Sequence, residues 1–384
     1  METYNIQSIL ETYGKEFLKL HPLSLEQLKV YYAIKKCKTP SLGFHIVQCD
    51  ECGDAHIGLN SCRNKHCPMC QDYAKEQWVL KESEYLLDVP YFFIGTTVPE
   101  ELNPLFLQNK KVMYNLLFKA TGETILKLGN DSQYLGAELG ITSILHTWGQ
   151  TMNMHPHIHS IVTGGGLKDN KWINLKKDDF LFPVKVFSDL FKKKFLSLLK
   201  EAQLEFFNDL EYLKDKDEFD KFVNSLYDKK WVEYIEPPKG SPLNAIEYMG
   251  RYSFKIAISN KRIKNIENDQ ITFEYKDYKE NGITKTMTIS VFEFIRRFFL
   301  HILPDRFCKI RHYGLLQNRN RKKKVKQCII LIGITAFSSF LKSNKKRIEI
   351  ICSKCGGTRF SYSYYYSNAP PSQNNNFNSL VYAS

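Results

Sequence analysis

Four cysteines near the amino terminus constrain the fold of this chain most strongly. Cys49 and Cys52 form one CxxC pair, Cys67 and Cys70 form a second, and 14 residues separate the two pairs. A CxxC turn brings two thiolates within reach of one ion, and two such turns complete a tetrahedron of sulfur ligands. Because four thiolates leave no open coordination position, the spacing predicts a structural zinc site and not a catalytic one.

Other cysteines and a histidine leave alternatives open. Cys62 and His66 lie between the two pairs, where each could replace one ligand or simply pack. Cys352 and Cys355 (CSKCGG) form a third pair with no partner pair nearby, so a second zinc or a turn with buried thiols fits equally. The amino terminus has no signal-peptide pattern, so we expect a cytosolic protein whose cysteines bind metal and do not form disulfides.

Composition indicates a folded protein with a polyanionic partner. The 384 residues are 43% hydrophobic and 14% aromatic, enough for two or three modest domains. The net charge is +13, and the basic residues are clustered at Lys192–Lys194, at Arg296–Arg297 and in RNRKKKVK (319–326). This clustering favours a protein that binds nucleic acid over one whose surface is merely basic. The apolar run CIILIGITAFSSFL (328–341) has 14 residues. A membrane span needs about 20, so we expect a buried helix and no membrane partner.

Hydrophobic periodicity and turn residues predict a mixed chain. We expect helices at 1–36, 71–87, 103–128, 184–229, 241–254 and 291–302, and strands at 91–98, 140–149, 157–166, 231–238, 271–275, 285–290 and 306–312. The strands at 140–149 and 157–166 are separated by a short polar link, which predicts a hairpin. The tail from about residue 360 is low in charge and rich in Ser, Asn and Tyr, so we expect it to be disordered.

The segment TMNMHPHIHSIVTGGG (151–166) contains three histidines at alternate positions. Alternate residues of a strand share a face, so His157 and His159 would project together and could chelate one divalent ion, with Ile158 in the core. Pro156 lacks a backbone donor and leaves His155 at the margin of the strand. The alternative is three histidines on a solvated strand face. Imidazoles alone do not choose between zinc, manganese and magnesium.

The second candidate element is a helix that begins at Ser241, with Pro242 at its first position. Tyr248 and Tyr252 are four residues apart and would share one helical face, and Lys255 lies three residues further on. A tyrosine has an ordinary pKa near 10 and is a poor nucleophile unless a cation or metal assists it. Taken alone, this spacing is more typical of core packing.

Together these motifs resemble the two-tyrosine HUH transposases of rolling-circle insertion sequences, the IS91 group. The resemblance extends over roughly residues 40 to 357, with the motifs in the family's order. Further similar stretches are LHTWGQ (145–150), VTGGG (162–166), EYMGRY (247–252) and EFIRRFFLHILPDRFCKIRHYGLL (293–316).

The resemblance implies an α+β fold. A small helical zinc-binding domain would precede an HUH nuclease domain, whose mainly antiparallel sheet is flanked by helices in the RRM or ferredoxin-like manner. The implied divisions are 1–90 for the helical and zinc-binding part, 91–316 for the catalytic domain, 317–359 for a basic helical extension with CxxC, and 360–384 for the tail.

The resemblance also implies a catalytic metal site. His157 and His159 match the metal-binding HUH pair, which would hold Mg²⁺ or Mn²⁺, while Zn²⁺ would occupy the cysteine site. Related enzymes take a third ligand from a neighbouring element. We expect Gln150 in that place, with His146 and His155 as alternatives.

Tyr248 and Tyr252 match the family's nucleophiles, and Lys255 resembles the helix lysine of replication-initiator relatives. The implied activity is transposition through cleavage and rejoining of single-stranded DNA by way of a 5′-phosphotyrosine. The partners would be single-stranded or hairpin transposon ends, in the bacterial cytoplasm and at its nucleoid. The oligomeric state stays open.

Three rival functions are weaker. A metal-dependent hydrolase with an HxH strand would need further ligands, but only His301 and His312 follow and regular βα alternation is absent. A non-catalytic zinc-dependent DNA-binding protein leaves HPHIH and YxxxY unexplained. A plasmid replication initiator or relaxase of HUH type shares the chemistry, but the cysteines and residues 293–316 resemble the transposase branch.

Overall fold

The computed structural model describes residues 4–333 and 351–366, and its centre is an antiparallel sheet. The strands lie in the order β11-β4-β5-β3-β7, and β6 pairs with the end of β5. Their bounds are β3 (Tyr91–Thr97), β4 (Glu138–Trp148), β5 (Met154–Lys168), β6 (Lys171–Asn174), β7 (Glu233–Glu236) and β11 (Ile310–Gly314). Every pairing in the sheet is antiparallel, which confirms the predicted α+β fold.

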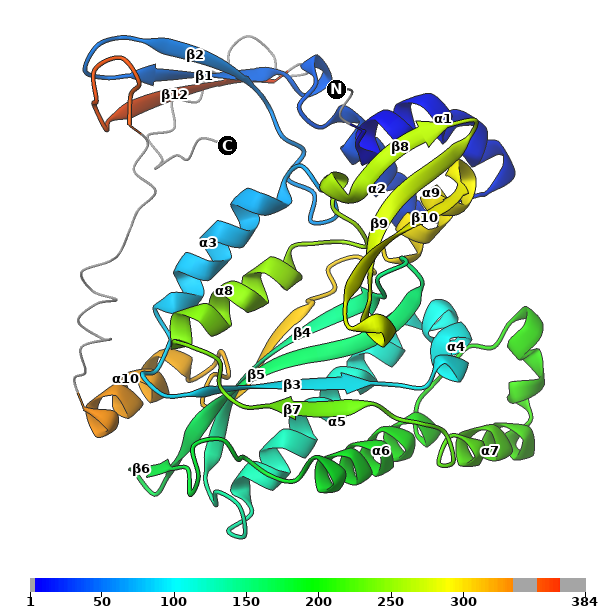
Figure 1. The fold of residues 1–384 in the computed structure, drawn as a ribbon, viewed down its shortest axis with the longest axis vertical. Helices are drawn as coiled ribbons and strands as arrows, with labels where there is room; N and C mark the ends of the chain where they lie inside the picture. The colour runs from blue at the N-terminus through cyan, green and yellow to red at the C-terminus, as the bar shows by residue number, and fades with distance from the viewer. Residues whose placement is uncertain (1–3, 334–350, 367–384) are drawn as a thin grey trace.

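Helices cover both faces of this sheet. They are α3 (Gln71–Ser83), α5 (Lys110–Asn130), α6 (Val184–Lys200) and α8 (Pro242–Ser253). Helices α5 and α6 lie on one face and α8, with α3 beside it, on the other (Figure 1). On β5, Ile158 and Val162 pack in the cores that contain α5 and α6, and Ile161 packs with α8. Because strand residues alternate, His157 and His159 share the α8 face with Ile161, and Ile158 points into the core as predicted.

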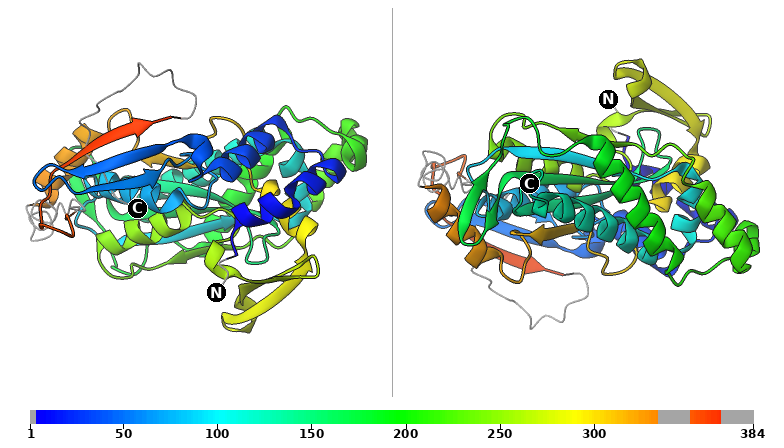
Figure 2. Two further views of the ribbon diagram at one scale, coloured as in Figure 1. Left: turned by 90° about the horizontal axis from the view of Figure 1, so that it is seen from above. Right: turned by 90° about the horizontal axis from the view of Figure 1, so that it is seen from below.

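The amino-terminal helices pack with a much later part of the chain. This unit contains α1 (Ile6–Leu20), α2 (Leu25–Lys36), β8 (Ile263–Glu267), β9 (Gln270–Asp277), β10 (Ile283–Ser290) and α9 (Val291–Leu300). Phe17 of α1, Tyr31 of α2 and Phe299 of α9 lie in one buried cluster. Figure 2 shows the β8–β10 sheet projecting from the body of the molecule.

Most predicted elements are present, with shifted ends. The hairpin predicted at 140–149 and 157–166 is β4–β5. The expected helix at 103–128 is divided in two at Asn109, whose side-chain amide donates a hydrogen bond to the carbonyl of Glu205. The expected helical region at 184–229 is interrupted after α6, and a second helix, α7, follows at 216–225. The remaining α-helices of the described chain are α4 (Asn103–Gln108), α7 (Lys216–Ser225) and α10 (Arg321–Ile332).

A small sheet joins residues 44–59 to the last described strand of the chain. Its order is β12-β1-β2, with bounds β1 (Phe44–Cys49), β2 (Ala55–Leu59) and β12 (Phe360–Tyr365). The prediction of disorder from residue 360 is therefore wrong for 360–365, because the aromatic-rich segment pairs along all of β1. The rest of the predicted tail, 367–384, lies outside the described residues.

The apolar run at 328–341 is described only in part. Helix α10 includes Cys328 to Ile332, and the remainder lies beyond the described residues. Among residues 4–333 and 351–366, no helix combines the length and the apolar character needed to cross a membrane.

Candidate active site and cysteine clusters

Three histidines meet on the α8 face of the central sheet. His157 and His159 lie on β5, and His146 lies directly opposite His157 on β4. One nitrogen of each ring lies within 4.8 Å of those of the other two. The structure therefore brings the predicted pair together and places His146 as their third neighbour.

Hydrogen bonds leave a free nitrogen on at least two of these rings. His146 Nε2 is 3.0 Å from the carbonyl of Tyr252, and His157 Nδ1 is 2.7 Å from the carbonyl of His155. A carbonyl only accepts, so these nitrogens donate and the other nitrogen of each ring keeps its lone pair. Burial, and then the neighbouring histidines, hold the pKa of both rings well below the usual value. Neutral rings with one free nitrogen are in the state that binds a cation.

His159 is held by a tyrosine that crosses a neighbouring strand. In the sheet, His159 lies beside Gly95 of β3, and Gly95 lies beside Tyr234 of β7. The Tyr234 hydroxyl is 2.9 Å from His159 Nδ1. A Cβ atom on Gly95 would lie 2.1 Å from Cε1 of the Tyr234 ring, so only glycine leaves room for the ring to cross.

Burial favours the neutral forms of both His159 and Tyr234. Burial lowers the pKa of His159 to about 4 and raises the pKa of Tyr234. In the tautomer whose Nδ1 donates to the hydroxyl, His159 Nε2 carries a free lone pair as well.

Gln150, the expected third ligand, is directed elsewhere. It lies in the turn after β4, where strand geometry no longer points side chains at the sheet face. Its Oε1 accepts a hydrogen bond from the backbone of Lys276 at 3.4 Å, and its own carbonyl accepts one from Arg262. Both contacts hold Gln150 toward the projecting sheet, so His146 is the better candidate. His155, the other alternative, is not in the histidine group, although its ring lies 4.9 Å from that of His157 and its carbonyl accepts a hydrogen bond from His157.

Helix α8 carries both candidate tyrosines on the histidine face of the sheet, with Tyr252 beside the histidines. It begins as predicted, with Ser241 Oγ accepting a hydrogen bond from the backbone of Asn244. The rings of Tyr248 and Tyr252 are 4.6 Å apart, and the Tyr252 ring is 5.9 Å from His146. The same ring is 6.1 Å from that of His159 and is partly exposed.

Tyr248 lies deeper than its neighbour. Its ring packs edge-on against Phe93 at 5.0 Å. Burial, with smaller contributions from Tyr252 and Tyr234, raises the pKa of Tyr248. Of the two phenols, Tyr252 is therefore the more accessible beside the histidines.

Lys255 does not extend this helical face. Helix α8 ends at Ser253, so the prediction that Lys255 shares the side of the two tyrosines is wrong. Partial burial, and then Arg262 and Arg251, lower the pKa of Lys255.

The cysteines form two groups of four that differ from the predicted set. Cys37, Cys62, Cys67 and Cys70 form one group, and Cys49, Cys52, Cys352 and Cys355 form the other. The prediction that Cys49 and Cys52 share an ion with Cys67 and Cys70 is therefore wrong. The reason is that the β1–β2 hairpin holds its CxxC pair on its own turn, beside the distant pair at 352–355.

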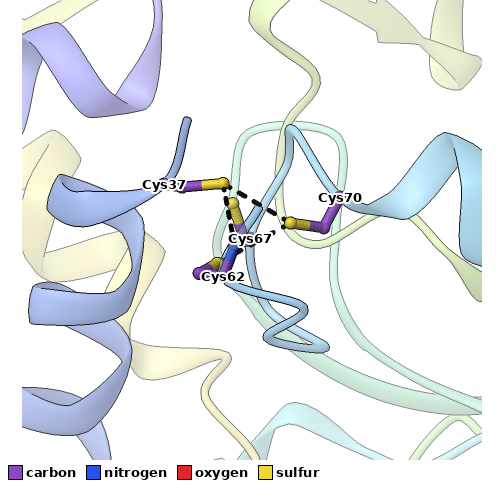
Figure 3. A group of neighbouring side chains, drawn as sticks. All are labelled: Cys37, Cys62, Cys67 and Cys70. Atoms are coloured by element: carbon purple, nitrogen blue, oxygen red, sulfur yellow. Dashed lines mark hydrogen bonds between the residues drawn. The ribbon is translucent and has the colours of Figure 1, made fainter. Parts of the chain in front are cut away.

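The first group has the geometry of a closed zinc site. Its thiols converge from the end of α2 and from the loop before α3 (Figure 3). Cys70 Sγ is 3.5 Å from Cys37 Sγ and 3.7 Å from Cys62 Sγ. The sulfur atoms of a tetrahedron with Zn–S bonds of about 2.3 Å are about 3.8 Å apart, so this set fits zinc. His66 is not a member, because its buried Nε2 accepts a hydrogen bond from the backbone of Leu303 at 3.1 Å.

Sequence reasoning missed Cys37 and Tyr234 and ranked His146 below Gln150. Cys37 has no CxxC partner, and Tyr234 is one aromatic residue in a short strand, so neither carries a local signal. His146 stands in the quoted LHTWGQ stretch, and only its register with His157 distinguishes it from Gln150.

Part of the basic charge is used inside the fold. Arg321 is buried and paired with Glu82, and Lys324 pairs with Glu138. From the same run, Lys322 and Lys323 are exposed. Arg297 pairs with Glu293 of its own helix and is half-buried, whereas Arg296 pairs with the same glutamate but is exposed. The surface open to a polyanion is thus smaller than the sequence suggests.

Comparisons with known proteins identify the family. The family described as "Transposase zinc-binding domain" matches residues 9–98, and the family described as "Putative transposase" matches residues 140–324. The chain is 42% identical over 337 residues to "Putative transposase y4qJ" of Sinorhizobium fredii, a match that covers 86% of this chain and 84% of the relative. It is 26% identical over 294 residues to "Transposase for insertion sequence element IS801" of Pseudomonas savastanoi pv. phaseolicola, which covers 74% and 68% of the two chains. No solved structure matches. The chain therefore belongs to the IS91 group of insertion-sequence transposases, DNA-acting proteins with an amino-terminal zinc-binding domain.

Proposed function

We propose that this transposase cleaves and rejoins single-stranded DNA through a 5′-phosphotyrosine, in rolling-circle transposition of an insertion sequence. The observation that carries the proposal is the position of Tyr252 beside three clustered histidines. A non-catalytic DNA-binding protein would have no need for this arrangement.

The donor set suits a divalent cation. His146, His157 and His159 would hold it through the ring nitrogens that do not donate hydrogen bonds. When bound, Mg²⁺ or Mn²⁺ polarises the scissile phosphate and offsets its charge. Mg²⁺ is usually held by carboxylates and water, so an all-imidazole set favours Mn²⁺ of the two.

The tyrosines supply the covalent step. The Tyr252 oxygen attacks the phosphorus, the bond from phosphorus to the 3′-oxygen breaks, and the phenol proton passes to water while the leaving oxygen is protonated to a 3′-OH. The phosphodiester energy is retained in the phosphotyrosine, so a 3′-OH can later attack it and rejoin a strand without ATP. Tyr248, whose ring is 4.6 Å away, would hold the second strand during exchange.

DNA would approach the partly exposed side of Tyr252. Single-stranded or hairpin ends fit this site, because a base-paired strand would have to open before its phosphate reached the buried His146 and the half-buried His157 and His159. The exposed Lys322 and Lys323 are candidates for backbone contacts.

The test is covalent capture of DNA. The protein is incubated with Mn²⁺ and labelled single-stranded oligonucleotides taken from the DNA on either side of the gene, and adducts are separated on a denaturing gel. We expect adducts with the unchanged protein and with Tyr248→Phe, few with Tyr252→Phe, and none with the double variant.

Tyr313→Phe is the matched control, because its hydroxyl donates to the carbonyl of Phe118 and not to the site. A double variant that still forms adducts would overturn the proposal. Adducts with Tyr252→Phe equal to those of the unchanged protein would overturn the assignment of the first nucleophile.

A further inference from the structure

The second cysteine group is assembled from two distant parts of the chain. Cys49 and Cys52 lie at the turn between β1 and β2, and Cys352 and Cys355 lie just before β12. Cys49 Sγ is 3.6 Å from Cys355 Sγ, and Cys52 Sγ is 3.6 Å from Cys352 Sγ. These separations match the edge of about 3.8 Å expected for a tetrahedral S₄ metal site.

The two turns of this group have the same backbone structure. In CDECGD, Gly53 N donates to Cys49 O at 2.9 Å and Cys49 N donates to Asp54 O at 2.8 Å. In CSKCGG, Gly356 N donates to Cys352 O and Cys352 N donates to Gly357 O, both at 2.8 Å. The glycines have φ of 74° and 75°, a conformation that other residues rarely adopt. Each turn therefore presents its two thiols in the same way, and the Cys49/Cys52 pair faces the Cys352/Cys355 pair.

Strand pairing and charge bring the two turns together. The β12–β1 register ends with Phe360 opposite Cys49, and Asp50 N donates to Arg359 O at 3.0 Å. Arg359 Nε is also 3.6 Å from a carboxylate oxygen of Glu51. The position of the distant pair is thus fixed by contacts that directly follow it in the chain, at Arg359 and Phe360.

This small sheet lacks a hydrophobic core that could stabilise it alone. In the described part of β1, β2 and β12, the buried side chains are those of Cys49 and Tyr362. Larger apolar groups are exposed, including Ile57 at 73% and Leu59 at 42%. Three short strands with so little burial need another source of stability, and a structural metal is a common one.

We propose that Cys49, Cys52, Cys352 and Cys355 bind a second structural zinc ion, which fastens the carboxyl-terminal strand β12 to the amino-terminal hairpin. The match to the zinc-binding domain ends at residue 98, so it does not include the distant half of this site. The ion crosslinks Cys52 to Cys352 and so converts a weak strand pairing into a stable sheet. This inference is independent of the proposed nuclease chemistry.

The first test is metal content. Zinc and iron per chain are measured by mass spectrometry for the full-length protein and for Cys352→Ser/Cys355→Ser. We expect the variant to contain about one zinc per chain less than the unchanged protein. Any zinc held at the histidines is present in both proteins and so does not affect this difference. The matched control is Cys308→Ser/Cys328→Ser, two cysteines outside both groups, which should keep the full content.

The second test measures the crosslink directly. A specific protease site is inserted between residues 333 and 351, and the cut protein is passed over a sizing column with and without a zinc chelator. We expect the carboxyl-terminal fragment to stay bound until the chelator is added, and to separate at once in the cysteine variant.

Four outcomes would overturn the proposal. They are unchanged zinc in Cys352→Ser/Cys355→Ser, iron in place of zinc, fragments that stay together without metal, and cysteines found as disulfides after denaturation.

Discussion

The contact between Tyr234 and His159 gives a sharp test of how the histidine site is held. Replacing Tyr234 by Phe removes one hydroxyl, 2.9 Å from His159 Nδ1, and leaves the ring in place. Loss of such a partner of a metal-binding histidine typically lowers metal affinity by about 10- to 100-fold, or about 1.4 to 2.7 kcal/mol. We expect Tyr234→Phe to need 10- to 100-fold more Mn²⁺ for half-maximal DNA adduct formation, with the same plateau.

Gly95→Ala should have a larger effect through the same contact. The new Cβ would lie 2.1 Å from the Tyr234 ring, whereas ordinary contacts begin at 3.4 Å. The ring must therefore move by about 1.3 Å or more, which is enough to break the hydrogen bond to His159. We expect a shift in Mn²⁺ dependence at least as large as that of Tyr234→Phe.

Both variants have matched controls elsewhere in the fold. Tyr313→Phe removes a hydroxyl that donates to a backbone carbonyl, and Gly122→Ala places a Cβ 2.9 Å from the Tyr313 ring. Neither contact includes a histidine of the site, so both controls should keep the wild-type Mn²⁺ dependence. The reasoning fails if Tyr234→Phe titrates like the unchanged protein, or if it loses the plateau without a shift in Mn²⁺ dependence.

Three further predictions concern stability and DNA binding. Arg321→Met should lower the free energy of unfolding by about 3 to 5 kcal/mol in urea titrations, because it leaves the buried carboxylate of Glu82 with only His312, 3.8 Å away, whose pKa burial lowers to about 4; a loss below about 1 kcal/mol would contradict this. Burial lowers the pKa of His301 to about 4, below its unfolded value of about 6.5, so the unfolded chain binds the extra proton first and stability falls as pH drops from about 6.5 toward 4. In the same titrations His301→Gln should reduce that fall by up to about 1.4 kcal/mol per pH unit, and an unchanged slope would count against it. The Lys322→Gln/Lys323→Gln variant should reduce the slope of log affinity against log salt for single-stranded DNA by about 1.4 in binding titrations, and no change would show that these side chains do not contact phosphate.

Local patterns in the sequence predicted those parts of the site that lie within a single strand or a single helix. The alternation of His157 and His159 and the four-residue spacing of Tyr248 and Tyr252 need only a strand and a helix, and both are present. His146 could not be chosen over Gln150, because the choice depends on the register of β4 against β5. Lys255 was misplaced because the helix ends two residues before it.

The cysteines show the same limit more clearly. A CxxC spacing predicts that two thiols act together, and each pair does lie within one group. Which pairs share an ion depends on contacts between segments that are distant in sequence. Neither the spacing of 14 residues nor the solitary Cys37 carries that information.

The joining of β12 to β1 has a consequence for the order in which a newly made chain can fold. A ribosome adds about 5 to 20 residues per second, so the roughly 300 residues between Cys52 and Cys352 take about 15 to 60 seconds to make. During that interval β1 has an unpaired edge and its CxxC turn has no partner pair, whereas the four members of the first group, Cys37, Cys62, Cys67 and Cys70, are all made within the first 70 residues. The first cysteine group can thus assemble early in synthesis, while the second group and the pairing of β12 with β1 must wait until synthesis passes residue 355.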